Sequence, residues 1–105
     1  MKRIVSIGTK QHWDPFPDAS YLEAPEFEDR LQQYRNGDFS LIGISAEAEI
    51  VVDGVCQTIT SGGLWGIESD SKHQYLSEVE QEEVDQLKAI LQSLGFSGSE
   101  IPSTR

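Results

Sequence analysis

The stretch ISAEAEIVVDGVCQTIT, residues 44–60, alternates apolar and polar side chains and carries an Asp-Gly pair near its centre. Alternation of this kind is the pattern of a strand with one buried face, because successive side chains of a strand point to opposite sides. Asp53-Gly54 is typical of a two-residue hairpin turn whose central residues both need positive φ. The stretch therefore predicts an antiparallel hairpin with the pairs Val52–Val55, Glu49–Thr58 and Glu47–Thr60.

The predicted hairpin has one apolar face, which has to be covered for the sheet to be stable. The first strand is expected to span residues 39–52. The apolar face comprises Ile42, Ile44, Ala46, Ala48, Ile50, Val52, Val55 and Ile59. Gln57 also falls on this face and is its one misfit. Glu47 and Glu49 lie on the opposite, polar face, together with Cys56 and the threonines.

The next stretch, SGGLWGIESDS at residues 61–71, has three glycines, a tryptophan and two carboxylates. A phosphate-binding loop would need a helix directly after it and a lysine or arginine nearby, whereas here Glu68 and Asp70 would repel phosphate. A metal loop could use Glu68, Asp70 and His73, with His12 and Asp14 folding back, but the spacing is not that of an EF-hand. The glycines favour a bent third strand at residues 64–68, with Trp65 and Ile67 on one side.

Two helices are predicted, one before these strands in the sequence and one after them. Before the hairpin, a short strand is expected at residues 4–7 and a surface loop in the proline-rich segment 11–25. The first helix is expected to begin at Pro25 and to stop near Asn36, before Gly37. Ser77 and Glu80 form a capping box for a second helix, residues 78–94, that ends at Gly95-Phe96. Its buried stripe comprises Val84, Leu87, Ile90, Leu91 and Leu94.

These elements predict an α+β fold with the order β-α-β-β-β-α. The sheet is expected to be a three- to four-stranded antiparallel meander covered by both helices. A chain of 105 residues is about one domain, which we place at residues 1–96, with residues 97–105 as a flexible tail. The chain shows neither a membrane span nor a signal peptide, and its single cysteine forms no internal disulfide, so a cytoplasmic location is expected.

The net charge of −10 is the strongest compositional feature. Residues 36–105 carry twelve acidic and three basic side chains. Such a chain repels nucleic acid and anionic membranes and favours a basic protein partner. In the second predicted helix, three carboxylates recur at i, i+4 and i+7 on one face. The expected partner-binding residues are these three and the acids of the strands: Glu47, Glu49, Glu68, Asp70, Glu78, Glu82 and Asp85.

No residue pattern indicates catalysis. Cys56 lies opposite Val51 with no histidine nearby in sequence, and a domain of this size leaves little room for a sugar-lined cleft between paired carboxylates. We therefore expect a protein without catalytic residues, metal or cofactor. Two alternatives stay open: a small metal- or ligand-dependent enzyme built on residues 68–73, and a housekeeping interaction module in which Trp13 or Trp65 anchors a partner or a homodimer.

The sequences AEAEIVV, SGGLWGIESDS and YLSEVEQEEVDQLKAILQSLGF resemble a group of small acidic proteins of bacteria, their phages and prophages. These share a GGLWGIESDS core followed by an acidic helix, and the resemblance spans residues 39–96. It implies no catalytic residues. Small acidic phage proteins are similar, as a class, to inhibitors of host defence such as anti-CRISPR proteins. The resulting hypothesis is a phage-derived, non-enzymatic inhibitor of a nucleic-acid-binding host protein, acting in the host cytoplasm through nucleic-acid mimicry.

Overall fold

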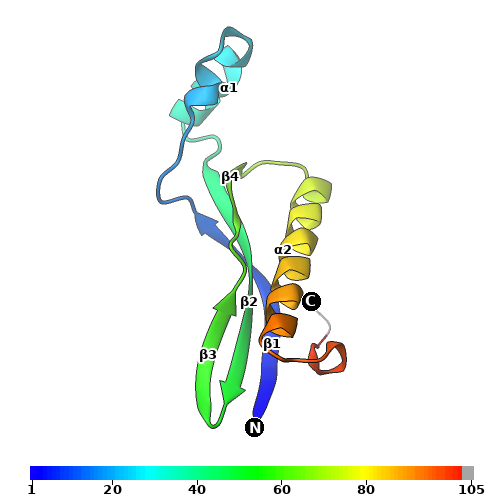
Figure 1. Ribbon diagram of the computed structural model, residues 1–105. Coiled ribbons are helices and arrows are strands. Elements are labelled where there is room, and N and C mark those ends of the chain that lie inside the picture. Colours follow the sequence, from blue (N-terminus) through cyan, green and yellow to red (C-terminus); the bar gives the residue numbers. More distant parts are fainter. Residues whose placement is uncertain (103–105) are drawn as a thin grey trace.

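The computed structural model describes residues 1–102, which form a four-stranded antiparallel sheet and two α-helices (Figure 1). The order of elements is β1 (Lys2–Trp13), η1 (Ser20–Glu23), η2 (Pro25–Phe27), α1 (Glu28–Arg35), β2 (Leu41–Val52), β3 (Val55–Thr60), β4 (Leu64–Glu68), α2 (His73–Ser93) and η3 (Gly98–Glu100). The predicted α+β class and element order are confirmed. The molecule is elongated, with extents of 56 × 24 × 19 Å.

Strand β2 is the centre of the sheet. One edge of β2 pairs with β1 from one end of β1 to the other, from Lys2 opposite Val52 to Trp13 opposite Ile42. Its other edge pairs first with β3 and then with β4. The prediction of a simple meander was wrong on this point, because β4 returns to β2 instead of adding beyond β3. Twelve residues of β2 are long enough to pair with two short strands in succession.

The hairpin between β2 and β3 has the predicted turn and register. Asp53 and Gly54 both have positive φ, 49° and 83°. Glu47 lies opposite Thr60, Glu49 opposite Thr58 and Val52 opposite Val55, as the alternation predicted. This register directs the carboxylates of Glu47 and Glu49 away from the core.

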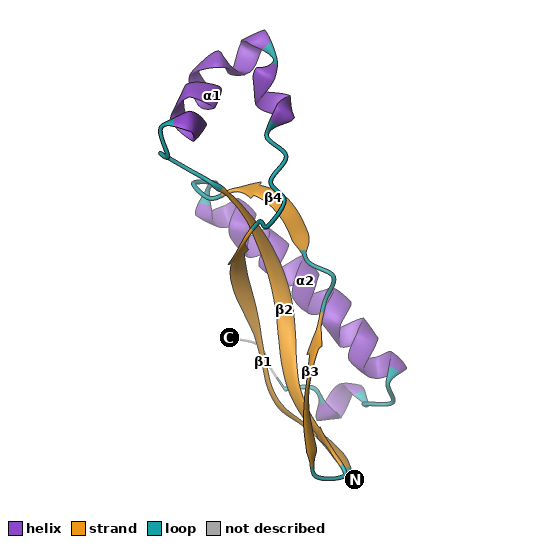
Figure 2. Cartoon of the chain, turned by 90° about the vertical axis from the view of Figure 1, so that its left-hand side faces the viewer, coloured by secondary structure: helices purple, strands orange, loops and turns teal. Residues whose placement is uncertain are grey.

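Helix α2 covers one face of the sheet, and the other face is uncovered (Figure 2). The principal core lies between α2 and the apolar face of the sheet and comprises Ala46, Ala48, Ile50, Val84, Leu87, Leu91 and Phe96. A second cluster continues it toward the start of α2 with Ile42, Ile44, Ile67 and Val79.

Helix α1 does not cover the sheet, so that part of the prediction was wrong. Residues 14–39, which we call the head, extend beyond the end of the sheet (Figure 1). The head has a small core of its own, in which Leu31 and Tyr34 of the predicted helix pack against Leu22, Phe39 and Leu41. Its local apolar contacts explain why α1 forms so far from the main core.

A bulge in β4 explains the glycine-rich stretch. Ile67 pairs with Ile42 and Leu64 with Ile44, so Trp65 and Gly66 together lie opposite Gly43. Gly66 has a φ of 75°, which suits the extra residue of a bulge. The prediction that Trp65 and Ile67 share one side was therefore wrong. Ile67 packs beneath α2, whereas Trp65 lies on the uncovered face against His12.

Gly43 is required by the position of Trp65. A Cβ atom built on Gly43 would lie 2.1 Å from Cε3 of the Trp65 ring, so the ring must move if any side chain is present. We expect Gly43→Ala to lower the free energy of unfolding by about 1–2 kcal/mol. In a Trp13→Phe background the Trp65 fluorescence should shift to the red as the indole enters water. Unchanged emission would show that Trp65 does not occupy this position.

Two element boundaries differ from the prediction by five residues or more, and smaller differences occur where η2 precedes α1 at Glu28 and where β2 begins at Leu41. Strand β1 runs to Trp13, well beyond the predicted end at Ile7, because residues 8–13 each lie opposite a residue of the long strand β2. Helix α2 begins at His73, so Ser77 lies inside it and its hydroxyl contacts the His73 ring at 3.4 Å. The predicted capping box at Ser77 is therefore not formed. Leu94, predicted to be buried, is 50% exposed.

The stop signals of both helices are confirmed. Gly37 and Gly95 have positive φ, and the Phe96 amide donates to the Leu91 carbonyl at 3.1 Å in a Schellman arrangement. Beyond Phe96 the chain does not leave the fold at once: η3 follows, and Ile101 packs against the main core. The last part of the predicted tail, residues 103–105, lies outside the described residues. No helix within residues 1–102 is long and apolar enough to cross a membrane.

Candidate protein-interaction site

The structure places the seven predicted partner-binding carboxylates on three separate surfaces. Glu47 and Glu49 lie on the uncovered face of the sheet, and Glu68 and Asp70 lie where β4 ends. The other three are on α2. They do not form one continuous acidic face, so each surface has to be considered by its own contacts.

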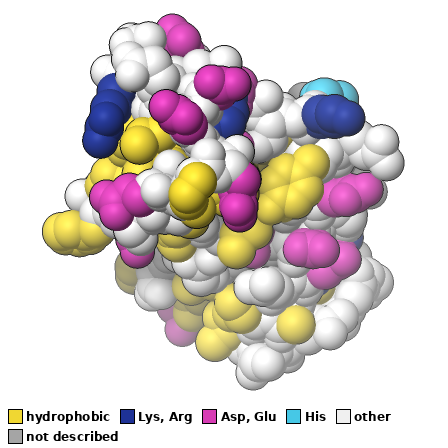
Figure 3. Space-filling model, turned by 90° about the horizontal axis from the view of Figure 1, so that it is seen from above, with side chains coloured by type: hydrophobic (Ala, Val, Ile, Leu, Met, Phe, Trp, Pro, Cys, Tyr) yellow, Lys and Arg dark blue, Asp and Glu magenta, His cyan; other side chains and the backbone are white. Residues whose placement is uncertain are grey.

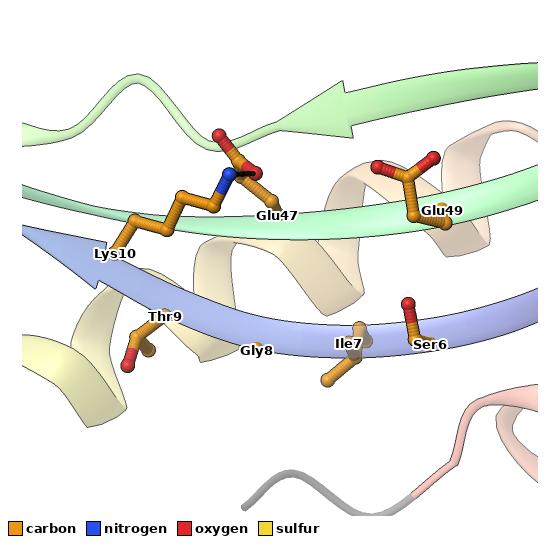
Figure 4. Close-up of a pocket in the computed structure, with 7 residues that line it drawn as sticks. All are labelled: Ser6, Ile7, Gly8, Thr9, Lys10, Glu47 and Glu49. Atoms are coloured by element: carbon orange, nitrogen blue, oxygen red, sulfur yellow. Dashed lines mark ion pairs between the residues drawn. The ribbon is translucent and has the colours of Figure 1, made fainter.

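The carboxylates on the sheet are largely engaged within the molecule. Lys10 of β1 reaches across to Glu47, with Nζ 3.0 Å from Oε2, and the Glu47 side chain is only 20% exposed. Thr58 donates to Glu49 at 2.9 Å. Figure 4 shows the Lys10–Glu47 pair bridging two strands beside Gly8, with α2 behind the sheet. The hollow here has a volume of about 220 Å³ and is lined by Ser6, Ile7, Gly8, Thr9, Lys10, Glu47 and Glu49.

Glu68 and Asp70 are held by one arginine of the head. Arg30 Nη2 lies 2.9 Å from Glu68 Oε1 and 2.8 Å from Asp70 Oδ1, and Nη1 reaches the second Asp70 oxygen at 3.0 Å. The guanidinium also stacks over the Phe39 ring, 3.8 Å from its centroid. The hydrogen bonds from Arg30 lower the pKa of Asp70 and, with those to Glu68, raise the pKa of Arg30 itself. This cluster connects the head to the sheet.

Tyr21 belongs to the same cluster. Its hydroxyl donates to Glu68 Oε2 at 2.6 Å. Burial of the phenol and this hydrogen bond to a carboxylate raise the pKa of Tyr21 to about 12, because an ionised phenolate would face Glu68 without a proton between them. Glu68 is therefore occupied on both oxygens, and sequence reasoning could not foresee partners 38 and 47 residues away.

The three predicted carboxylates of α2 differ from those of the sheet and of β4 in their contacts. Glu78, Glu82 and Asp85 are all exposed on the face away from the sheet, as predicted. Their side-chain contacts are with glutamines: Gln74 approaches Glu78 at 3.4 Å, and Gln81 donates to Asp85 at 2.9 Å. Within residues 1–102 no lysine or arginine forms an ion pair with any of the three. We call these residues the α2 stripe.

Glu83 is an acidic residue whose role the sequence analysis missed. The sequence pattern gave it no role of its own, but it is only 3% exposed. One oxygen, Oε1, accepts from the Ser61 hydroxyl at 2.7 Å and from the Gly63 amide at 2.8 Å. The signal was present, since Glu83 lies at i+4 from Val79 and i−4 from Leu87, both buried. Glu83 holds the junction between β3 and β4 against α2.

The arrangement around residues 68–73 differs from that of a metal site. Glu68 and Asp70 bind Arg30, while His73 lies in the first turn of α2 near Ser77. No group of three histidine, cysteine or acidic side chains is placed to hold a metal ion in the described part of the chain. Cys56 is exposed on β3, on the predicted outer face.

Neither tryptophan is part of the main core. Trp13, at the end of β1, is 77% exposed, and Trp65 is 44% exposed. Comparison of the chain with protein-family models, with curated proteins and with solved structures finds no match. The functional assignment therefore has to rest on the surfaces themselves.

Proposed function

We propose that the protein is a non-enzymatic inhibitor that binds a basic, nucleic-acid-binding host protein through the α2 stripe. The observation that supports this most is the difference between the stripe and the other acidic surfaces. Glu47, Glu68 and Asp70 have a cationic partner within the molecule and Glu49 accepts a hydrogen bond from Thr58. The stripe is the surface on which all three carboxylates have no cationic partner within residues 1–102. Their charge is therefore free to attract an external cation.

The sequence of α2 also argues against a face selected only for solubility. An exposed helix is stabilised when glutamate and lysine alternate at i and i+4, and like charges at this spacing destabilise it. Between His73 and Gln86 there are five acids and no lysine or arginine, and Glu78 and Glu82 form a like-charge i, i+4 pair. The helix thus retains a cost of a few tenths of a kcal/mol that binding to a basic partner would offset.

The spacing of the stripe fits part of a phosphate backbone. Seven residues of helix span roughly 10.5 Å, so three carboxylates give about one charge per 5 Å. One strand of duplex DNA carries one charge per roughly 3.4 Å of axis, and the two strands together twice that density. The stripe therefore suits a groove that binds a single strand better than one that encloses a duplex.

An unpaired acidic stripe on a small acidic protein suits an inhibitor of the anti-CRISPR type, which is the class we propose. In this proposal it acts in the cytoplasm of the host. It would occupy a basic nucleic-acid groove of an effector and thereby exclude the target strand, without itself binding nucleic acid or membrane.

The test is inhibition of target-DNA binding by purified, guide-loaded CRISPR effectors. The protein should reduce DNA binding, and the triple variant Glu78→Gln, Glu82→Gln and Asp85→Asn should need at least about tenfold more protein for the same effect. A control with the same change in net charge is Asp38→Asn, Asp53→Asn and Glu100→Gln, all exposed and away from the stripe. Equal inhibition by both triple variants would contradict a role for the stripe.

A further inference from the structure

The head carries a second surface, which differs from the α2 stripe in that aromatic side chains are its main feature. Phe16 is 89% exposed and Trp13, three residues earlier, is 77% exposed. Single exposed apolar residues are common on proteins and need no explanation. Two large aromatic side chains this close in sequence, at the same end of the molecule, are the kind of residue that dominates protein interfaces.

The loop that carries Phe16 is restrained by prolines and by local hydrogen bonds. Pro15 and Pro17 on either side restrict the backbone. The Asp14 carboxylate accepts from the Phe16 amide at 3.0 Å, and the Asp18 carboxylate accepts from the Ser20 amide at the same distance. A side chain presented by a restrained loop loses little conformational entropy when it binds, which favours affinity.

The segment of the head that carries Phe16 is acidic, and the two arginines of the head, Arg30 and Arg35, follow it in α1. Residues 14–29 contain six acids and no lysine or arginine. Within the same segment Tyr21 and Phe27 pack edge to face and stay 42% and 37% exposed. Figure 3, seen from the end of the molecule that bears the head, shows hydrophobic side chains set among acidic ones.

A hollow lies directly beside Trp13. It has a volume of about 580 Å³ and is lined by Gln11, His12, Trp13 and Ile42. The surface at this end thus combines projecting aromatic rings with a recess that can accept a side chain of the partner. Complementary projections and recesses are a general property of well-packed interfaces.

We propose that Phe16 of the head and Trp13, three residues earlier at the end of β1, are hydrophobic anchors that dock into an apolar pocket rimmed by lysine and arginine on a basic partner protein. The charge of residues 14–29 selects this occupant, because a second copy of the acidic head or an anionic membrane would be repelled. The inference rests on the proposed function for the basic character of the partner and adds a second contact to it, independent of the α2 stripe.

The experiment titrates the full chain with a helical peptide of lysine and leucine, and compares it with a lysine and serine peptide of equal charge, using calorimetry. We expect the leucine peptide to bind at least about tenfold more tightly, and Phe16→Ser to remove most of that advantage. Phe16→Leu should retain part of it. Val55→Ser, at a residue 56% exposed in the distant hairpin, should bind like the original chain.

Equal binding of the two peptides, or unchanged binding by Phe16→Ser, would overturn the inference. So would self-association in sedimentation that Phe16→Ser abolishes, or binding to neutral lipid vesicles through Phe16, since the occupant would then be a second copy or a membrane. The α2 stripe variant separates the two proposals. If it loses the leucine peptide and Phe16→Ser does not, the head inference fails while the stripe stands. If Phe16→Ser loses the leucine peptide and the stripe variant keeps it, the head inference is supported, and the stripe is contradicted only when its variant and the matched control inhibit an effector equally.

Discussion

Replacing Glu83 by alanine is expected to lower the free energy of unfolding by about 3 kcal/mol. The carboxylate is 3% exposed and accepts hydrogen bonds from Ser61 and Gly63. Its removal leaves a buried hydroxyl and an amide without their acceptor and opens space under α2. Ser61 in turn donates its amide to Ala46 and accepts the Ala46 amide through Oγ, so the junction of β3 and β4 should loosen as well. Denaturant unfolding followed by circular dichroism measures the loss.

The matched control for this prediction is Glu83→Gln. A glutamine carbonyl can accept from both the Ser61 hydroxyl and the Gly63 amide in the same place, so we expect a loss below about 1 kcal/mol. If alanine and glutamine destabilise the protein equally, the negative charge itself would be needed and the hydrogen bonds would not explain the burial of this residue.

Replacing Arg30 by alanine is expected to lower the free energy of unfolding by about 2 kcal/mol and to release the head from the sheet. An isolated surface ion pair contributes less than this. Arg30 binds two carboxylates at once, Glu68 and Asp70, and stacks on Phe39, so several contacts are lost together. Amide hydrogen exchange should show faster exchange in α1 while α2 and β2 stay protected.

Arg30→Lys tests which contact matters. Lysine keeps the positive charge but cannot form the forked hydrogen bonds or stack in the same way, so we expect an intermediate loss. Exchange in α1 that stays unchanged in Arg30→Ala would contradict the view that this cluster positions the head. The small core in which Leu22 and Phe39 of the head pack with Leu41 of β2 would then be sufficient.

The sequence predicted the parts of this fold that depend on local patterns. Asp53-Gly54 determined the hairpin and its register, and Gly37 and Gly95 marked the helix ends. It did not predict features that depend on residues far apart. The bulge at Gly66 reversed the side chains of β4, and nothing nearby in the sequence shows that Trp65 has to lie over Gly43.

The candidate sites also comprise features that follow from local patterns and features that depend on residues far apart. Exposure of Glu78, Glu82 and Asp85 followed from helical periodicity, because it depends on only two turns of α2. The neutralisation of Glu68 and Asp70 by Arg30 involves residues 38 and 40 positions apart and could not be read from spacing. Phe16 was assigned only to a surface loop, since sequence alone does not show that two prolines and two aspartates present it outward.

The central claim, that the α2 stripe replaces a phosphate backbone in a basic groove, is tested most directly by the salt dependence of binding to an inhibited effector. The affinity should fall steeply as salt rises, because each carboxylate that pairs with a lysine or arginine contributes an interaction that salt screens. The variant Glu78→Gln, Glu82→Gln and Asp85→Asn should bind more weakly and with a shallower slope of log Kd against log salt, whereas Asp38→Asn, Asp53→Asn and Glu100→Gln should keep the original slope. Binding that is insensitive to salt, or a stripe variant with an unchanged slope and affinity, would contradict the account.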